Sequence, residues 1–164
     1  MRNLSDILGD QKLDLLINNS GILSVESVQN MDFEAIRRQF EVNAIGPLRV
    51  TTALRKNLIR GSKVIIITSR MGCIGDNTSG GFYGYRMSKA AVNMAGVSLA
   101  RDLLPHGIIV QMLHPGMVET DMTAQFGGGI SAEESARGLV KRIEEATIHT
   151  SGKIFHMNGE ELPF

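Results

Sequence analysis

The sequence has no tryptophan and only one cysteine, Cys73, in 164 residues. A single cysteine excludes a disulfide within the chain and fits a reducing compartment. Charge is balanced, with 17 Lys and Arg against 17 Asp and Glu, and no basic block indicates a nucleic-acid partner. No apolar run reaches the ~18 residues that cross a bilayer. The N-terminus also lacks the layout of a signal peptide, so we expect a cytoplasmic protein without a membrane span.

The remaining composition is that of an ordinary globular domain. Hydrophobic residues make up 43% of the chain and charged residues 21%, and this length suffices for one domain with a core. Continuous apolar runs predict strands that are buried on both faces, as in a parallel sheet. These runs cover 13–19, 63–69, 108–113 and, more weakly, 153–157.

Helical periodicity fills the segments between these strands. The pattern predicts helices over 33–59, 84–104 and 131–146, the last opened by a capping box at Ser131. Pro47 lies inside the first helix and predicts a kink near 43–46. Strands that alternate with helices define an α/β fold with right-handed crossovers.

Two glycine-rich loops follow the predicted strand ends. They cover 70–84 and 115–130, and the second contains Gly127-Gly128-Gly129. Open α/β sheets bind ligands at the carboxyl ends of their strands, so these loops are candidate site walls or lids. For the triple glycine, a flexible surface loop without a functional role is an equally good interpretation.

The segment with the clearest chemical use begins at Phe82. Tyr85 and Lys89 stand four residues apart in a helical run, so their side chains share one face. Lowering a phenol pKa from near 10 to 7 requires about 4 kcal/mol. An ammonium ~4 Å away at an effective dielectric of 20 supplies about 4 kcal/mol. Tyr85 is therefore a plausible general acid, although the bare motif also fits a core-edge tyrosine beside a solvated lysine.

Further motifs, in order, place this pair in a known pattern. They are Asn18-Asn19-Ser20-Gly21, Asn43 in Val42-Asn43-Ala44-Ile45-Gly46, the strand-terminal Ser69, Tyr85-x-x-x-Lys89, and Pro115-Gly116-x-Val118-x-Thr120. Together they resemble the short-chain dehydrogenase/reductase family. The resemblance covers nearly the whole chain and departs from the family's Asn-Asn-Ala-Gly only at Ser20.

The resemblance implies a site and a reaction. It implies an oxidoreductase that uses NADP or NAD on a small carbonyl or alcohol, with Asn43, Ser69, Tyr85 and Lys89 as catalytic residues. Tyr85 would move the substrate proton, Ser69 would hold the substrate oxygen, Lys89 would lower the tyrosine pKa and bind the ribose, and Asn43 would hold a water. The implied cofactor-binding residues are Asn19, Ser20, Gly21, Tyr85, Lys89, Pro115, Gly116, Val118 and Thr120.

A narrower resemblance exists within the family. Asn77-Thr78-x-Gly80-Gly81, Tyr85-Arg86-Met87-Ser88-Lys89 and Leu113-His114-Pro115-Gly116 are similar to the C-factor branch. That branch includes the myxobacterial C-signal protein and the sniffer-type carbonyl reductases. The 16 residues from Ser69 to Tyr85 (85 − 69) exceed the family's usual spacing, and this branch carries the same insertion.

One family feature is absent from the sequence. The glycine-rich cofactor fingerprint Thr-Gly-x-x-x-Gly-x-Gly does not occur before Leu13. We therefore expect a single truncated domain over 1–164, the C-terminal part of a Rossmann-type doubly wound parallel sheet with the family's strands 4 to 7. The missing part leaves a second function open, a non-catalytic, C-signal-like developmental or cell–cell signalling protein.

The truncation also predicts self-association. An open edge at strand 13–18 favours pairing with a second chain, and the helical faces over 32–59 and 84–104 correspond to the family's dimer face. We therefore expect a homo-oligomer.

Other reactive side chains have simpler interpretations. Cys73 either touches substrate or is a small buried hydrophobic residue. His114 is structural by the family comparison, and His106, His149 and His156 show no metal-ligand spacing. No metal is therefore expected. Met117 and Met122 are candidates to line an adaptable pocket.

Overall fold

The computed structural model describes residues 4–164; residues 1–3, with which the predicted domain begins, lie outside the described part. Its strands form one sheet in the order β1-β2-β3-β4-β5. The parallel strands are β1 (Leu13–Asn18), β2 (Leu58–Ile67), β3 (Ile109–His114) and β4 (Ile154–His156). β5 (Glu161–Leu162), which the sequence analysis missed, is antiparallel to β4. The predicted α/β fold with a parallel sheet is confirmed.

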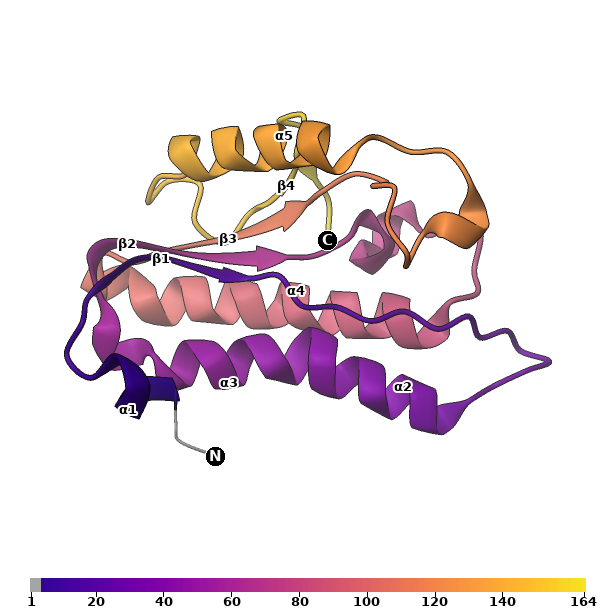
Figure 1. The fold of residues 1–164 in the computed structure, drawn as a ribbon, viewed down its shortest axis with the longest axis horizontal. Helices are drawn as coiled ribbons and strands as arrows, with labels where there is room; N and C mark the ends of the chain where they lie inside the picture. Colours follow the sequence, from indigo (N-terminus) through magenta and orange to yellow (C-terminus); the bar gives the residue numbers. More distant parts are fainter. Residues whose placement is uncertain (1–3) are drawn as a thin grey trace.

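Helices cover both faces of this sheet (Figure 1). On one face lie α2 (Phe33–Phe40), α3 (Gly46–Ala53) and the long α4 (Tyr83–Leu103), and on the other lies α5 (Ala132–Glu145). The Ser131 hydroxyl accepts from the Glu134 amide at 3.1 Å, so it caps α5 as predicted. The short α1 (Leu4–Leu8) was not predicted.

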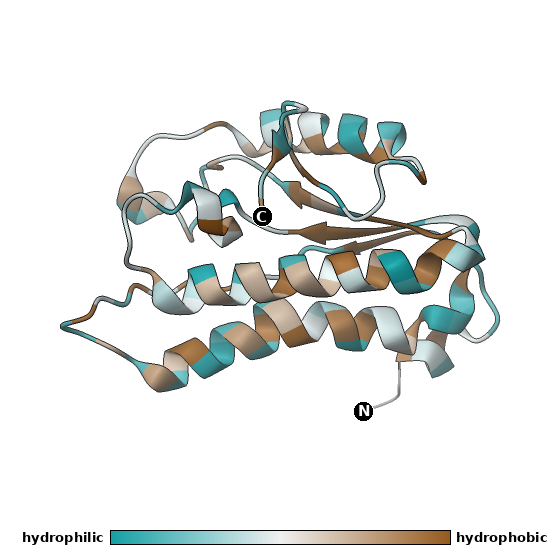
Figure 2. Cartoon of the chain, turned by 180° about the vertical axis from the view of Figure 1, so that it is seen from behind, coloured by the Kyte–Doolittle hydropathy of each residue, from teal (hydrophilic) through white to brown (hydrophobic). Residues whose placement is uncertain are grey.

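The core lies between the sheet and α4. Val64, Ile66, Val110 and Met112 are almost inaccessible and pack with Val92 of α4. The strands appear as apolar ribbons between amphipathic helices in Figure 2. Burial of this apolar surface contributes about 25 cal/mol per Å². It holds α4 against the sheet, with its N-terminal turns near the carboxyl ends of the strands. The catalytic candidates sit at that end.

The kink predicted near Pro47 takes the form of a π-helical turn. Residues Glu41–Ile45 (η1) separate α2 from α3, and the Gly46 amide bonds to the Glu41 carbonyl, five residues back. Pro47 has no N–H to donate to the carbonyl four residues earlier, so the regular ladder is interrupted there. The wide turn contains Asn43, which is 1% exposed.

The predicted helix 33–59 is too long at its C-terminal end. α3 ends at Ala53, and β2 already begins at Leu58. The reason is a tertiary contact: the Asn57 amide donates to the carbonyls of Gly9 and Gln11 at 2.9 and 2.7 Å. These two bonds hold residue 57 beside the segment before β1. A helix continued to residue 59 would not place Asn57 there.

A tight contact joins β2 to α4 through the turn η3 (Arg70–Gly72). A Cβ at Gly72 would lie 2.7 Å from the Lys89 carbonyl carbon and 2.8 Å from its Cβ. These are backbone and near-backbone atoms that cannot rotate away. The turn after Ser69 can therefore approach α4 only because residue 72 is glycine.

We predict that Gly72→Ala lowers the free energy of unfolding by about 1–3 kcal/mol, because the methyl group overpacks against the α4 backbone. Urea denaturation measures the change. Gly75→Ala is the matched control, since a Cβ there meets only the Phe164 carbonyl at 3.8 Å. Equal stability of the two variants would contradict the contact.

Candidate active site

Ser69 stands at the carboxyl end of β2, where the strand turns into η3. Its backbone is extended, and its hydroxyl accepts from the Met71 amide at 3.1 Å. The residue is 6% exposed. A serine is suited to this position because its oxygen caps the turn while the O–H remains available to a ligand.

Tyr85 and Lys89 enter the same region from the first turns of α4. The Lys89 ammonium lies 5.6 Å from the centre of the Tyr85 ring and donates to the Ile67 carbonyl at 2.9 Å. The shared helical face that their spacing predicts is therefore present. Lys89 is 3% exposed, so α4 holds a nearly buried amine against the end of β2.

Asn43 connects the segment after β1 to α4. Its carbonyl oxygen accepts from the Ile22 amide at 2.8 Å, and its amide donates to the Ile22 carbonyl and the Ser88 hydroxyl, both at 2.9 Å. The Ser88 hydroxyl in turn donates to the Tyr85 carbonyl at 2.8 Å. These three bonds use both N–H groups and one lone pair of the Asn43 side chain, and they position the strand-end segment relative to Tyr85.

The predicted cofactor residues lie in two segments, one after β1 and one after β3. A Cβ at Gly21 would lie 3.6 Å from both Asn43 Oδ1 and Lys89 Nζ, so the Asn19-Ser20-Gly21 segment passes beside the lysine. Asn19 and Ser20 themselves are exposed. Gly116 lines the pocket described below.

Three further predicted residues lie outside that pocket. The Pro115 carbonyl accepts from Ser135 of α5 at 2.7 Å. Val118 forms a bridge with Ile130, and Thr120 borders a separate hollow of about 410 Å³. Pro115, Val118 and Thr120 are therefore not among the residues that line the pocket beside Ser69 and Tyr85.

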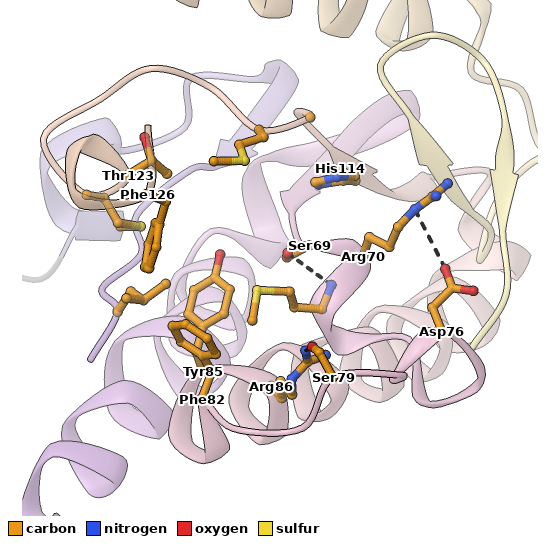
Figure 3. A pocket seen from close by; sticks show the side chains of 15 residues that line it. Ser69, Arg70, Asp76, Ser79, Phe82, Tyr85, Arg86, His114, Thr123 and Phe126 are labelled. Atoms are coloured by element: carbon orange, nitrogen blue, oxygen red, sulfur yellow. Dashed lines mark hydrogen bonds and ion pairs between the residues drawn. The ribbon is translucent and has the colours of Figure 1, made fainter. Parts of the chain in front are cut away.

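A pocket of about 510 Å³ opens beside Ser69 and Tyr85 (Figure 3). Its walls come from the segment after β1, the loop 70–82, the start of α4 and the loop after β3. Apolar side chains dominate: Leu23, Met71, Phe82, Met117, Met122 and Phe126. The prediction that Met117 and Met122 line a pocket is confirmed.

The two glycine-rich loops meet above this pocket. The rings of Phe82 and Phe126 contact edge to face with centroids 5.7 Å apart. The loop that carries Phe126 is closed by two backbone hydrogen bonds: the Ile130 N–H donates to the Met117 carbonyl at 2.8 Å, and the Glu119 N–H donates to the Ile130 carbonyl at 3.0 Å. Phe126 thus belongs to the pocket wall, whereas Gly127 and Gly128 do not line this pocket and border a separate hollow.

A buried carboxylate, Glu26, holds the start of α4 in place. It is 2% exposed and accepts from the Gly84 amide at 3.0 Å and the Gln39 side chain at 3.1 Å. Its backbone carbonyl also accepts from Phe82, the one non-glycine residue among residues 4–164 with positive φ (51°). Glu26 therefore holds both sides of the turn before Tyr85. No sequence motif marks this residue, because its partners are distant in the chain.

The electrostatics of Tyr85 differ from the sequence prediction. Burial raises the pKa of the Tyr85 phenol above its ordinary value, while the neighbouring Ser69 side chain acts in the opposite direction. The expectation that Lys89 lowers this pKa is not met: the pKa is raised, and loss of solvent is the largest cause. Burial also lowers the pKa of Lys89 to about 8.

Two other candidates have structural positions. Cys73 is fully buried in the core, so its interpretation as a small hydrophobic residue is the right one. His114 borders the pocket and stacks edge to face on His156 with centroids 4.9 Å apart. Burial, followed by His156 and the positive charges of Arg70 and Lys89, lowers the pKa of His114 to about 3, so this imidazole is neutral.

Known proteins are similar to this chain in sequence and in fold. The short chain dehydrogenase family profile matches residues 3–129. A 1-hydroxy-2-glutathionyl-2-methyl-3-butene dehydrogenase of Rhodococcus sp. (strain AD45) is 48% identical over 154 residues, which cover 92% of this chain and 68% of that protein. The C-signal of Myxococcus xanthus is 42% identical over 155 residues, 93% of either chain.

A solved structure matches as well. The NADPH-bound carbonyl reductase from chicken fatty liver superimposes with a TM-score of 0.88 at 29% identity, over 98% of this chain and 69% of that one. The chain therefore belongs to the short-chain dehydrogenase/reductase family of oxidoreductases, and the resemblance to C-signal and to carbonyl reductases is confirmed. Within residues 4–164, no helix is long and apolar enough to cross a membrane.

The low pKa of Lys89 makes stability depend on pH. Since the folded-state pKa, about 8, lies below the ordinary 10.5, the native state binds fewer protons between these values. Stability should therefore rise with pH across this window. The full shift in the Lys89 pKa corresponds to roughly 3 kcal/mol of unfolding free energy.

We predict that Lys89→Met removes this rise. Urea unfolding at about pH 7 and about pH 10 should show the wild type gaining stability relative to Lys89→Met. Lys141→Met, an exposed change on α5, is the control and should follow the wild type. Parallel pH profiles of wild type and Lys89→Met would contradict a buried, destabilised ammonium.

Proposed function

We propose that this protein reduces a small carbonyl compound with a nicotinamide cofactor, or oxidises the corresponding alcohol, and that it does so as one domain in the cytoplasm. The observation that carries this proposal is the convergence of Ser69, Tyr85 and Lys89 beside a pocket of about 510 Å³ at the strand ends. The chain's family and its carbonyl reductase neighbour support it.

Each of the three side chains has a role that its surroundings support. Tyr85 donates the proton to the substrate oxygen, and its raised pKa keeps the phenol protonated in neutral solution. Ser69 donates a hydrogen bond to the same oxygen and fixes it beside the phenol. Lys89 supports the developing charge on the phenol oxygen from the neighbouring turn of the helix. Asn43 holds the segment after β1 in place relative to α4 through its hydrogen bonds to Ile22 and Ser88.

The residues present fit the nicotinamide half of an NADP or NAD molecule. Lys89 uses one hydrogen bond, to Ile67, and retains further donors for ribose hydroxyls. The absence of a side chain at Gly21 leaves space beside that amine. When bound, the cofactor supplies the hydride. Asn19, Ser20, Pro115, Gly116, Val118 and Thr120 are proposed to border it, and the NADPH-bound reductase supports a nicotinamide cofactor.

Nicotinamide fluorescence on titration with NADPH and NADH tests the proposal. We expect saturable binding that weakens at least about tenfold in Lys89→Ala, because one charged hydrogen-bond donor is lost. Tyr85→Phe should bind cofactor as the wild type does, yet lose about 10²- to 10⁴-fold in carbonyl reduction.

Two outcomes would contradict this function. Turnover by Tyr85→Phe at the wild-type rate excludes the proton-transfer role. Absence of cofactor binding to a chain shown to be folded by circular dichroism excludes the nicotinamide site in this chain. Arg101→Gln, an exposed change at the far end of α4, is the control for both measurements.

A second candidate function is C-signal-like developmental or cell–cell signalling without catalysis. The supporting observation is the 42% identity to C-signal, which covers 93% of that protein, whereas the chain covers 68% of the Rhodococcus dehydrogenase. A folded chain that binds no cofactor would favour this function.

We infer further that the protein forms a homo-oligomer. Leu15 and Ile17 on β1 are 40% and 46% exposed, and β1 pairs only with β2 among the described strands. Phe33 of α2 and Met94 of α4 are also exposed. These apolar groups favour association through the open edge or the helical face.

Light scattering should therefore report a mass above that of one chain. Ile17→Lys should shift the protein toward monomer if the β1 edge mediates pairing, whereas Met94→Lys should do so if the helical face does. A monodisperse wild-type monomer would count against both.

A further inference from the structure

The charges around the pocket do not cancel. Five lining residues are titratable: Arg70, Asp76, Tyr85, Arg86 and His114. Arg70 lies 2.6 Å from Glu160 and 3.6 Å from Asp76, so its charge is compensated and Asp76 is engaged. The phenol and the imidazole are neutral near pH 7. Arg86 is left as the uncompensated positive charge among the lining residues.

Arg86 also has hydrogen-bonding capacity to spare. Its Nη2 donates to the Ser79 hydroxyl at 2.9 Å, and it has no acidic partner within the described part of the chain. Its Nε is buried without a hydrogen-bond partner. A guanidinium with free donors in a fixed fork is suited to a carboxylate or a similar anion, which accepts two parallel bonds.

Arg86 lies at a different part of the pocket from the hydroxyl groups of Ser69 and Tyr85. Figure 3 shows the Tyr85 hydroxyl directed toward the side where Ser69 lies, whereas Arg86 and Ser79 lie together away from that end. Much of the remaining wall is apolar and includes Phe82, Met71 and Phe126. A ligand that satisfies the whole pocket therefore needs a carbonyl or alcohol at one end, an apolar body and an anionic group at the other.

We propose that the substrate is an apolar aldehyde, ketone or alcohol that carries a carboxylate, with Arg86 and Ser79 as its anion-binding residues. This inference rests on the proposed function, because it concerns the same pocket. Arg86 follows Tyr85 directly in the chain, so the two side chains leave α4 in directions about 100° apart. The reacting oxygen and the anion must accordingly be several bonds apart in the substrate.

Binding is measured first, without turnover. Isothermal titration calorimetry compares a series of aliphatic ω-hydroxy carboxylates of increasing length with their methyl esters, in the presence of saturating NADPH, the reduced cofactor that cannot oxidise an alcohol. We expect one chain length at which the acid binds about ten to a hundred times more tightly than the ester, the range typical of a charged hydrogen bond. This preference should disappear in Arg86→Gln, persist in part in Arg86→Lys, and remain unchanged in Arg101→Gln.

Equal binding of acid and ester, or an acid preference that survives in Arg86→Gln, would overturn the inference. Turnover of the matching ω-oxo carboxylates and esters with NADPH then separates the two proposals. Equal reduction of acid and ester leaves the reductase function in place and removes the anion site. An Arg86-dependent acid preference without any NADPH oxidation supports the anion site and rejects the reductase function.

Discussion

The hydrogen bond from Lys89 to the Ile67 carbonyl is the contact on which the site depends. It joins the first turns of α4 to the carboxyl end of β2 and holds an amine in a region almost closed to solvent. Burying that group is costly without a partner. With α4 packed on the core and joined by this bond to the end of β2, Tyr85 one turn earlier lies near Ser69, which follows Ile67 by two residues.

A second layer of buried polar contacts keeps this arrangement rigid. Asn43, held in the π-helical turn, bonds to both backbone groups of Ile22 and to Ser88. Glu26 bonds to the first turn of α4 and to Gln39. Such networks stabilise a single geometry only when each member has a partner. Here they hold the segment after β1, which contains little regular structure, against two helices.

The burial that organises the site also sets its acid–base chemistry. A phenol removed from water holds its proton more tightly, and an amine removed from water releases it more readily. Tyr85 and Lys89 show these two directions. A protonated phenol beside a substrate oxygen matches the reductive direction of the proposed reaction, whereas the oxidative direction requires the phenolate.

Local patterns predicted much of this structure. The four parallel strands, the capped α5, the kink before Pro47 and the shared face of Tyr85 and Lys89 all follow from periodicity, turn residues and helical spacing, which act over a few neighbouring positions. The end of α3 was misplaced because Asn57 bonds to the distant Gly9 and Gln11. β5 was too short to show a pattern.

What the sequence by itself determined is therefore the order of the elements, the strand ends at which the catalytic candidates gather, and the family. Only the tertiary structure decided the direction of the Tyr85 pKa, because desolvation depends on everything packed around the ring. It also decided that Arg70 is paired while Arg86 is not, since Glu160 reaches Arg70 from the far end of the chain. Charges, burial and long-range hydrogen bonds are properties of proximity in space, which no local pattern contains.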